Sequence, residues 1–201
     1  YGLVGSEMCI RDSLQDEPTV KVFNEMNFEY GTLGNHEFDE GLGEFNRIMK
    51  GEAPTPGQFN KIVDEYPHEA SKQEVVIANL VDKDTNKIPF DWKPYTIKEI
   101  PVNDKTVKVG FIGVVTTEFP NLVLRKNHEQ YRVLDEAESI AKYARELNDQ
   151  GVHAIAVLAH VAATSKNGVA EGPAADMIKK LNQIYPENSV DIVFAGHNHQ
   201  Y

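Results

Sequence analysis

The sequence predicts an α/β fold, a mostly parallel β-sheet with helices on its outer faces. Short, continuous apolar segments at 75–78, 154–159 and 191–195 are typical of strands that are buried on both faces. Longer amphipathic segments, with apolar residues at helical spacing, lie between them, and this alternation is typical of strand–helix–strand units. The 201 residues are enough to bury a sizeable single core.

Local signals set the order of the elements. A helix is expected to open at Asp16-Glu-Pro, because proline is tolerated in a first helical turn, and another is expected at 41–50. Asp135 and Glu138 form a capping-box-like start for a third helix, and Gly172-Pro starts a fourth, with Met177, Ile178, Leu181 and Ile184 inward. The expected strands are 29–33, 75–78, 95–102, 106–115, 154–159 and 191–195.

Three segments organise the chain. Residues 1–13, YGLVGSEMCIRDS, have neither the basic start nor the long apolar stretch of a signal peptide, and they resemble translated sequencing-adapter DNA. We expect them to be foreign or disordered; a natural disordered terminus is the alternative. Residues 14–201 are expected to be a partial domain, truncated at both ends, because the chain stops two residues past a histidine pair. Residues 51–73, rich in proline and glycine, are expected to be an insertion.

Composition excludes several classes of function. Lys and Arg number 20 against 31 Asp and Glu, a net charge of −11, which disfavours binding to a nucleic acid polymer or an anionic membrane. No apolar run approaches the roughly 20 residues of a membrane-spanning helix, so no membrane insertion is expected. Cys9 is the single cysteine, so an intrachain disulfide is excluded. A cation is the more natural partner for so acidic a chain.

Polar side chains follow three of the expected strands. Asn35 and His36 come after the first strand, His160 after 154–159, and His197 and His199 after 191–195. Because the carboxyl ends of parallel strands meet at one edge of a sheet, we expect these five residues to cluster there. Imidazole and amide groups brought together from distant parts of a sequence form a metal-site pattern.

Each of these residues also has a plainer interpretation. A lone histidine after a strand is usually a surface or core residue. Asp39 is expected to hold His36, and it is also a candidate helix N-cap; the two roles can coexist. His68, His128 and His153 follow no expected strand, so no role is expected for them. The sequence has no Gly-x-Ser-x-Gly motif, so a serine hydrolase has no candidate nucleophile.

The segments GNHEFD, LAH and AGHNH, in that order, resemble the calcineurin-like metallophosphoesterases. The longer forms GNHEFD and GHNHQ make the chain similar to bacterial 5′-nucleotidases and 2′,3′-cyclic-nucleotide phosphodiesterases. The sequence around these motifs resembles that of secreted members of the family. The resemblance extends from about residue 14 to the end. It implies a metal-dependent hydrolase of phosphate esters in nucleotide catabolism, extracellular or associated with the cell wall, with a nucleotide as substrate.

The resemblance also implies roles for individual residues. Asn35, His160 and His197 would bind the second of two divalent metal ions, and His199 would bind the first. His36 would face the phosphate, to stabilise the transition state or protonate the leaving group, and Asp39 would orient it. The donors suit Zn²⁺, Mn²⁺, Co²⁺ or Fe equally.

One departure from the family pattern has a direct consequence. Members begin with an Asp-x-His strand and a later Gly-Asp whose aspartate bridges both metals, and neither pattern occurs upstream of Asn35. We therefore expect this chain to bind at most one ion and to be inactive by itself, whereas a longer parent with a separate nucleoside-binding domain is an enzyme. Two alternatives stay open: a phosphoesterase for another substrate class, such as phosphoproteins, and a non-catalytic binding module on the same fold.

Overall fold

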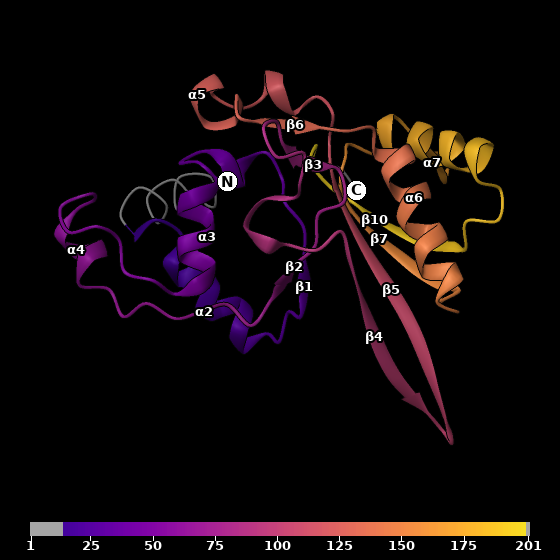
Figure 1. Ribbon diagram of the computed structural model, residues 1–201, viewed down its shortest axis with the longest axis horizontal. Coiled ribbons are helices and arrows are strands. Elements are labelled where there is room, and N and C mark those ends of the chain that lie inside the picture. Colours follow the sequence, from indigo (N-terminus) through magenta and orange to yellow (C-terminus); the bar gives the residue numbers. More distant parts are fainter. Residues whose placement is uncertain (1–13, 200–201) are drawn as a thin grey trace. The chain divides into compact units, whose positions relative to one another are not determined.

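The computed structural model describes residues 14–199, which form two compact units (Figure 1). Unit 1 comprises residues 14–29 and Glu40–Glu74, and unit 2 comprises Tyr30–Asp39 and residues 75–199. The expectation that residues 1–13 are foreign or disordered falls outside the described part of the chain.

Unit 2 is built on a four-stranded sheet in the order β10-β7-β5-β4. Strand β5 (Lys105–Val115) runs parallel to β7 (Ala154–His160), and β7 runs parallel to β10 (Val190–Ala195). Strand β4 (Tyr95–Val102) pairs antiparallel with β5 in a long hairpin (Figure 1). The α/β class and the parallel strands predicted from the sequence are therefore confirmed.

Shorter elements connect these strands. They are β1 (Tyr30–Gly31), η1 (His36–Phe38), β2 (Glu74–Val75), β3 (Leu80–Asp82), η2 (Pro89–Asp91), η3 (Phe119–Asn121), α5 (Arg125–His128), β6 (Tyr131–Val133), β8 (Thr164–Lys166) and β9 (Val169–Glu171). Strands β3 and β6 pair antiparallel, as do β8 and β9.

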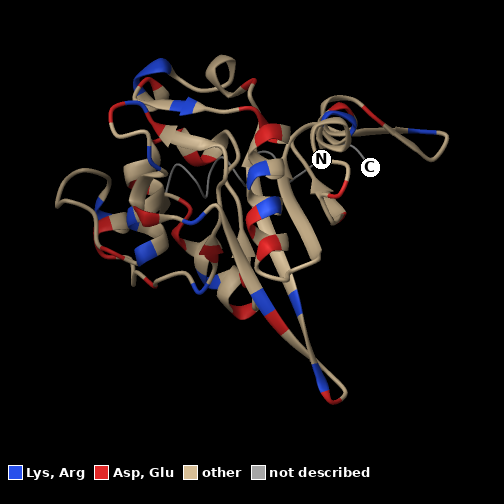
Figure 2. Ribbon diagram, turned by 45° about the vertical axis from the view of Figure 1, so that its right-hand side comes forward, with Lys and Arg blue, Asp and Glu red and all other residues tan. Residues whose placement is uncertain are grey.

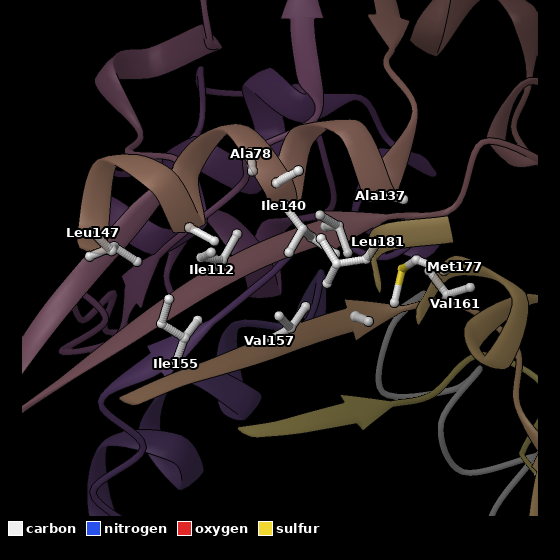
Figure 3. Close-up of a cluster of buried hydrophobic side chains, with 14 of the residues drawn as sticks. Ala78, Ile112, Ala137, Ile140, Leu147, Ile155, Val157, Val161, Met177 and Leu181 are labelled. Carbon is white, nitrogen blue, oxygen red and sulfur yellow. The ribbon is translucent and has the colours of Figure 1, made fainter. Parts of the chain in front are cut away.

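Helices α6 (Glu136–Asp149) and α7 (Pro173–Ile184) cover one face of the sheet (Figure 1). Both begin where the sequence predicts, and the Asp135 side chain accepts a hydrogen bond of 2.9 Å from the Glu138 amide as the N-cap of α6. The core between helices and sheet is a single apolar cluster (Figure 3), which includes Ile112, Ile140, Leu147, Ile155, Val157, Met177 and Leu181. Ile184, expected to point inward, is 38% exposed at the last residue of α7.

The sequence predicts that both faces of strand β10 are buried, and the structure differs. Val193 packs against the core under α7, whereas Ile192 and Phe194 are 47% and 55% exposed. Successive residues of a strand point to opposite faces, so within the described residues only the face of β10 that carries Val193 is covered.

Two expected strands are shorter than predicted. The strand expected at 29–33 is reduced to β1, and the strand expected at 75–78 is reduced to β2. Val76 forms an isolated parallel bridge with Lys93, and the amides of Val76 and Ile77 donate to the carbonyl oxygens of Gly31 and Lys93, at 2.9 and 2.8 Å. Their hydrophobicity reflects complete burial, with 0% exposure for both, rather than membership of a longer ladder.

Buried Asn79 fastens the end of β5. Its side-chain amide donates to the carbonyl oxygens of Val115 and Leu134, at 2.7 and 3.0 Å, and its oxygen accepts from the Val115 amide at 3.0 Å. The residue is 0% exposed, so these bonds satisfy backbone groups that water does not reach. Asn79 therefore continues the β5 ladder to the last residue of that strand.

Unit 1 contains helices α2 (Glu17–Glu25), α3 (Leu42–Lys50) and α4 (Lys61–Asp64). Buried Arg47 lies between two carboxylates, with its Nη2 atom 2.7 Å from Oε1 of both Glu17 and Glu44. His68 Nδ1 lies 3.0 Å from the same oxygen of Glu17. Buried charges persist only when they are paired in this way, so His68 belongs to a structural network.

Residues 51–73, expected to be an insertion, pack with the other segments of unit 1. Asn24 of α2 donates to Glu69 Oε1 and to the Ala70 carbonyl oxygen, at 2.6 and 2.9 Å, and accepts from the Lys72 amide at 2.8 Å. The buried side chain of Asn24 therefore holds residues 69–72 beside α2.

Among the described residues, no helix combines the length and the apolar character that crossing a bilayer requires.

Gly113 offers a direct test of the packing in unit 2. A Cβ atom at this position of β5 would overlap the carbonyl oxygen of Val76 and lie 2.6 Å from Thr32 Oγ1. We expect Gly113→Ala to lower the free energy of unfolding by about 3 kcal/mol, the upper end for overpacking, because backbone atoms must move. Urea denaturation followed by circular dichroism measures this loss.

Gly43→Ala in α3 is the matched control, because a Cβ there meets nothing within 4 Å. It should be neutral or slightly stabilising. Equal destabilisation by the two substitutions would contradict the close passage of Val76 over β5.

Candidate metal and phosphoester site

The parallel register brings two strand ends to one edge of the sheet. His160, the last residue of β7, pairs with Val115 at the end of β5, and Ala195 at the end of β10 pairs with Ala159. The Thr116 amide donates to the His160 carbonyl oxygen at 3.0 Å. The chain therefore leaves β7 and β10 side by side, and the His197 loop starts next to His160.

Asn35 reaches the same point from the loop after β1. The loop is anchored by fully buried Leu33 and by Phe38, whose ring centroid lies 4.2 Å from that of Phe119. The Gly34 amide donates to Glu37 Oε2 at 2.6 Å and closes the turn. Asn35 itself is only 6% exposed, so its side chain is held beside the strand ends rather than in solvent.

Three donor atoms converge at this edge. His160 Nε2 lies 2.9 Å from Asn35 Oδ1 and 2.9 Å from His197 Nδ1, and the two imidazole rings meet edge to face. A single proton on Nε2 cannot serve both neighbours equally well. A cation bound to Nε2, Oδ1 and Nδ1 would use a lone pair of each of these three atoms.

The spacing and protonation state also suit a metal ion. Ligand atoms at about 2.1 Å from one ion and at right angles to each other are about 3 Å apart. Burial lowers the pKa of His160 to about 4, with smaller contributions from the positive charge that His197, His36 and His199 carry when protonated. His160 is therefore neutral at pH 7, as an imidazole ligand must be.

The donor set has one clear deficit. In residues 14–199, no three histidine, cysteine, aspartate or glutamate side chains are arranged to hold an ion; the trio described above depends on the Asn35 amide for its third donor. Neutral nitrogen and amide oxygen atoms fit a divalent transition metal, but they offset none of its charge.

His36 and Asp39 form the pair predicted from the GNHEFD motif. His36 Nδ1 lies 2.8 Å from Asp39 Oδ2, with side chains 68% and 24% exposed. Because a carboxylate only accepts, it favours the tautomer with the proton on Nδ1 and leaves Nε2 without one. The predicted contact between His36 and Asp39 is confirmed. The alternative role of Asp39 as a helix N-cap is wrong, because Gly41 precedes α3 as its N-cap.

The expected cluster of five residues forms in part. The structure brings Asn35, His160 and His197 into contact, and the positive charge that His36 and His199 carry when protonated lowers the pKa of His160. His199 is exposed. The roles given to the five residues, and to Asp39, stay predictions.

Sequence reasoning missed two residues that shape this site. A Cβ atom on Gly34 would lie 2.6 Å from His160 Cε1 and Nδ1, so only glycine lets the loop approach the ring. Asn198, between the two final histidines, bonds to the backbone of Ala163 through both atoms of its amide. The presence of a glycine directly before Asn35 was a signal for the role of Gly34. No local sequence pattern indicated the role of Asn198.

The three remaining histidines have other surroundings. His128 packs edge to face on Phe119 with ring centroids 5.3 Å apart, and His153 is exposed before the start of β7. Together with His68 in unit 1, they have the structural or surface positions that the sequence predicts.

Comparison with known proteins places these motifs in a family. The model of the family described as calcineurin-like phosphoesterase matches residues 11–201. The chain is 52% identical to the cell wall protein Lmo0130 of Listeria monocytogenes, over 99% of this chain and 26% of that protein. It is 36% identical to the endonuclease YhcR of Bacillus subtilis, over 98% of this chain and 15% of that protein.

Further matches include nucleotide phosphoesterases. The 2′,3′-cyclic-nucleotide 2′-phosphodiesterase/3′-nucleotidase of Salmonella typhimurium is 29% identical over 90% of this chain and 25% of its own length. The crystal structure of the calcineurin-like phosphoesterase YfkN from Bacillus subtilis superposes with a TM-score of 0.67 at 25% identity, covering 96% of this chain and 54% of that one. The chain thus spans about a quarter or less of the length of these curated relatives.

Gly34 tests whether the geometry of the trio matters. We expect Gly34→Ala to push the His160 ring out of line with Asn35 and His197, and to weaken Mn²⁺ binding about 10- to 100-fold. Isothermal titration calorimetry measures the change. Gly196→Ala is the control, because a Cβ there meets nothing within 4 Å. Unchanged affinity in Gly34→Ala would show that the trio is not the ion site.

Proposed function

Because the chain belongs to the calcineurin-like phosphoesterase family, we propose that it is part of a metal-dependent hydrolase that acts on nucleotides. The observation that carries the proposal is the convergence of Asn35 Oδ1, His160 Nε2 and His197 Nδ1 within 2.9 Å contacts. The His36–Asp39 pair, in the same loop as Asn35, would supply the acid–base group that such a hydrolase needs.

The trio would hold one divalent ion, and His199 would contribute to a second. Ions bound there would polarise the phosphoryl oxygens of the substrate and lower the pKa of water. Asn35 and His160 are held by the η1 loop and the end of β7, so their donors are positioned before any ion arrives. This preorganisation keeps the cost of assembling the site low.

His36 would act on the phosphate directly. Its Nδ1 lies against Asp39, so Nε2 would be the atom that faces the substrate. As an imidazolium, His36 would donate a hydrogen bond from Nε2 to a phosphoryl oxygen and then give that proton to the leaving alkoxide. Asp39 stabilises the imidazolium and fixes the plane of the ring.

The substrate class follows from the relatives and from charge. Relatives named for 3′-nucleotide and 2′,3′-cyclic-nucleotide hydrolysis favour small nucleotides as substrates. One relative is named an endonuclease, but the net charge of −11 disfavours a polymer on this part of the protein. Figure 2 shows acidic and basic residues intermixed along the β4–β5 hairpin, where Glu99 pairs with Lys108 at 3.4 Å.

Location follows by the same reasoning. The Listeria relative is named a cell wall protein, so an extracellular or wall-associated protein is the location that we propose.

Charge limits what the 201 residues can do alone. Asn35 and the three histidines are neutral donors, and neither Asp-x-His nor Gly-Asp occurs anywhere in the sequence. We therefore propose that the 201 residues hold at most one ion and turn over no nucleotide. A longer form with those aspartates would bind two ions and be active.

A comparison of the two forms tests this function. The longer form should hydrolyse nucleoside monophosphates and 2′,3′-cyclic nucleotides in the presence of Mn²⁺, and the 201 residues should not. In the longer form, His36→Ala should lower kcat by about 10²- to 10⁴-fold, the usual contribution of an acid–base group. Its affinity for Mn²⁺ should change little, because His36 lies outside the trio.

His153→Ala is the matched control, since that histidine is exposed before the start of β7. Loss of Mn²⁺ affinity in His36→Ala equal to its loss of turnover would make His36 a ligand. Activity towards phosphopeptides but not nucleotides would favour the other substrate class, and no activity would favour a binding module.

A further inference from the structure

The His197–His199 loop has an unfavourable backbone. His197 has φ +125° and His199 has φ +53°, both in the region that side chains other than glycine rarely adopt. Such a conformation persists only when contacts elsewhere hold it. Both histidines flank Asn198, so the contacts of this residue decide where their rings lie.

Asn198 uses its whole amide on one neighbour. Its Nδ2 donates to the Ala163 carbonyl oxygen at 2.8 Å, and its Oδ1 accepts from the Ala163 amide at 3.2 Å. This paired pattern is the one that two strands make. A side chain needs both a donor and an acceptor at short reach to make it, which excludes Ala and an ionised Asp.

The partner of Asn198 is itself fixed. Ala163 lies three residues after His160, and its neighbour Ala162 accepts a hydrogen bond of 2.9 Å from Ala174 in the first turn of α7. The Gly196 amide donates to the Ala159 carbonyl oxygen at 3.1 Å. His197 is therefore held on both sides against the segment that carries His160.

We propose that Asn198 is a positioning residue, which places the His197 ring against His160 by hydrogen bonding to the Ala163 backbone. The inference rests on the proposed function only where a metal ion is concerned; the placement of the ring rests on the contacts themselves. Asn198 does not contact the ion or the substrate in this role. It acts through His197.

The first measurement needs no metal. In the 201-residue chain without metal, a nuclear Overhauser effect should join the rings of His160 and His197, whose centroids are 4.8 Å apart. Asn198→Ala should abolish it and speed hydrogen exchange at the Ala163 amide. Asn121→Ala, an exposed asparagine after Phe119 and Pro120, is the matched control and should change neither.

Asn198→Asp separates positioning from folding. The carboxylate keeps the acceptor for the Ala163 amide but cannot donate to the Ala163 carbonyl oxygen. It should therefore fold, keep that amide protected and still lose the ring contact. Persistence of the ring contact in both folded variants would overturn the proposal.

Mn²⁺ titration is the second measurement. Asn198→Ala should weaken binding about 10- to 100-fold, as the loss of a residue that orients a ligand usually does. Unchanged affinity would also overturn the proposal. If the unsubstituted chain binds no Mn²⁺, the proposed function fails instead, and the ring contact alone decides the role of Asn198.

Discussion

The parallel register of β5, β7 and β10 is the constraint on which the site depends. It sets His160 opposite Val115 and Ala195 opposite Ala159, so the segments that leave β7 and β10 emerge together. The core under α6 and α7 holds this register, because Ile112, Ile155 and Val157 point into one apolar cluster. A shift of one residue would turn each of these side chains, and His160 with them, to the other face.

Backbone contacts then bring the donors to contact distance. Gly34 lets the Asn35 loop approach the His160 ring, and Asn198 fastens the His197 loop to Ala163. The result is a group of three donor atoms that one proton on His160 Nε2 cannot serve equally well. Burial lowers the pKa of His160 to about 4, so protonation does not relieve the conflict near pH 7. A cation would relieve it, which is the physical basis of the proposed function.

Much of this was predictable from local sequence. The continuous apolar segment before His160 indicated β7, the Asp135 and Glu138 spacing indicated the start of α6, and the i, i+3 spacing of His36 and Asp39 indicated their contact. These signals are local, because each depends on a period or a cap. The clearance at Gly34, the Asn198–Ala163 pair and the exposure of Phe194 depend on which strands become neighbours. No local pattern encodes those distances.

Paramagnetic broadening by Mn²⁺ tests the central claim most directly. Substoichiometric Mn²⁺ should broaden the ring signals of His160 and His197 and the side-chain amide of Asn35 first. The ring of His153 should stay sharp after that of His160 has broadened, because the length of β7 separates the two, roughly 20 Å for a strand of this size. Broadening of His153 before His160, or uniform broadening of every histidine, would contradict an ion site at the carboxyl edge of the sheet.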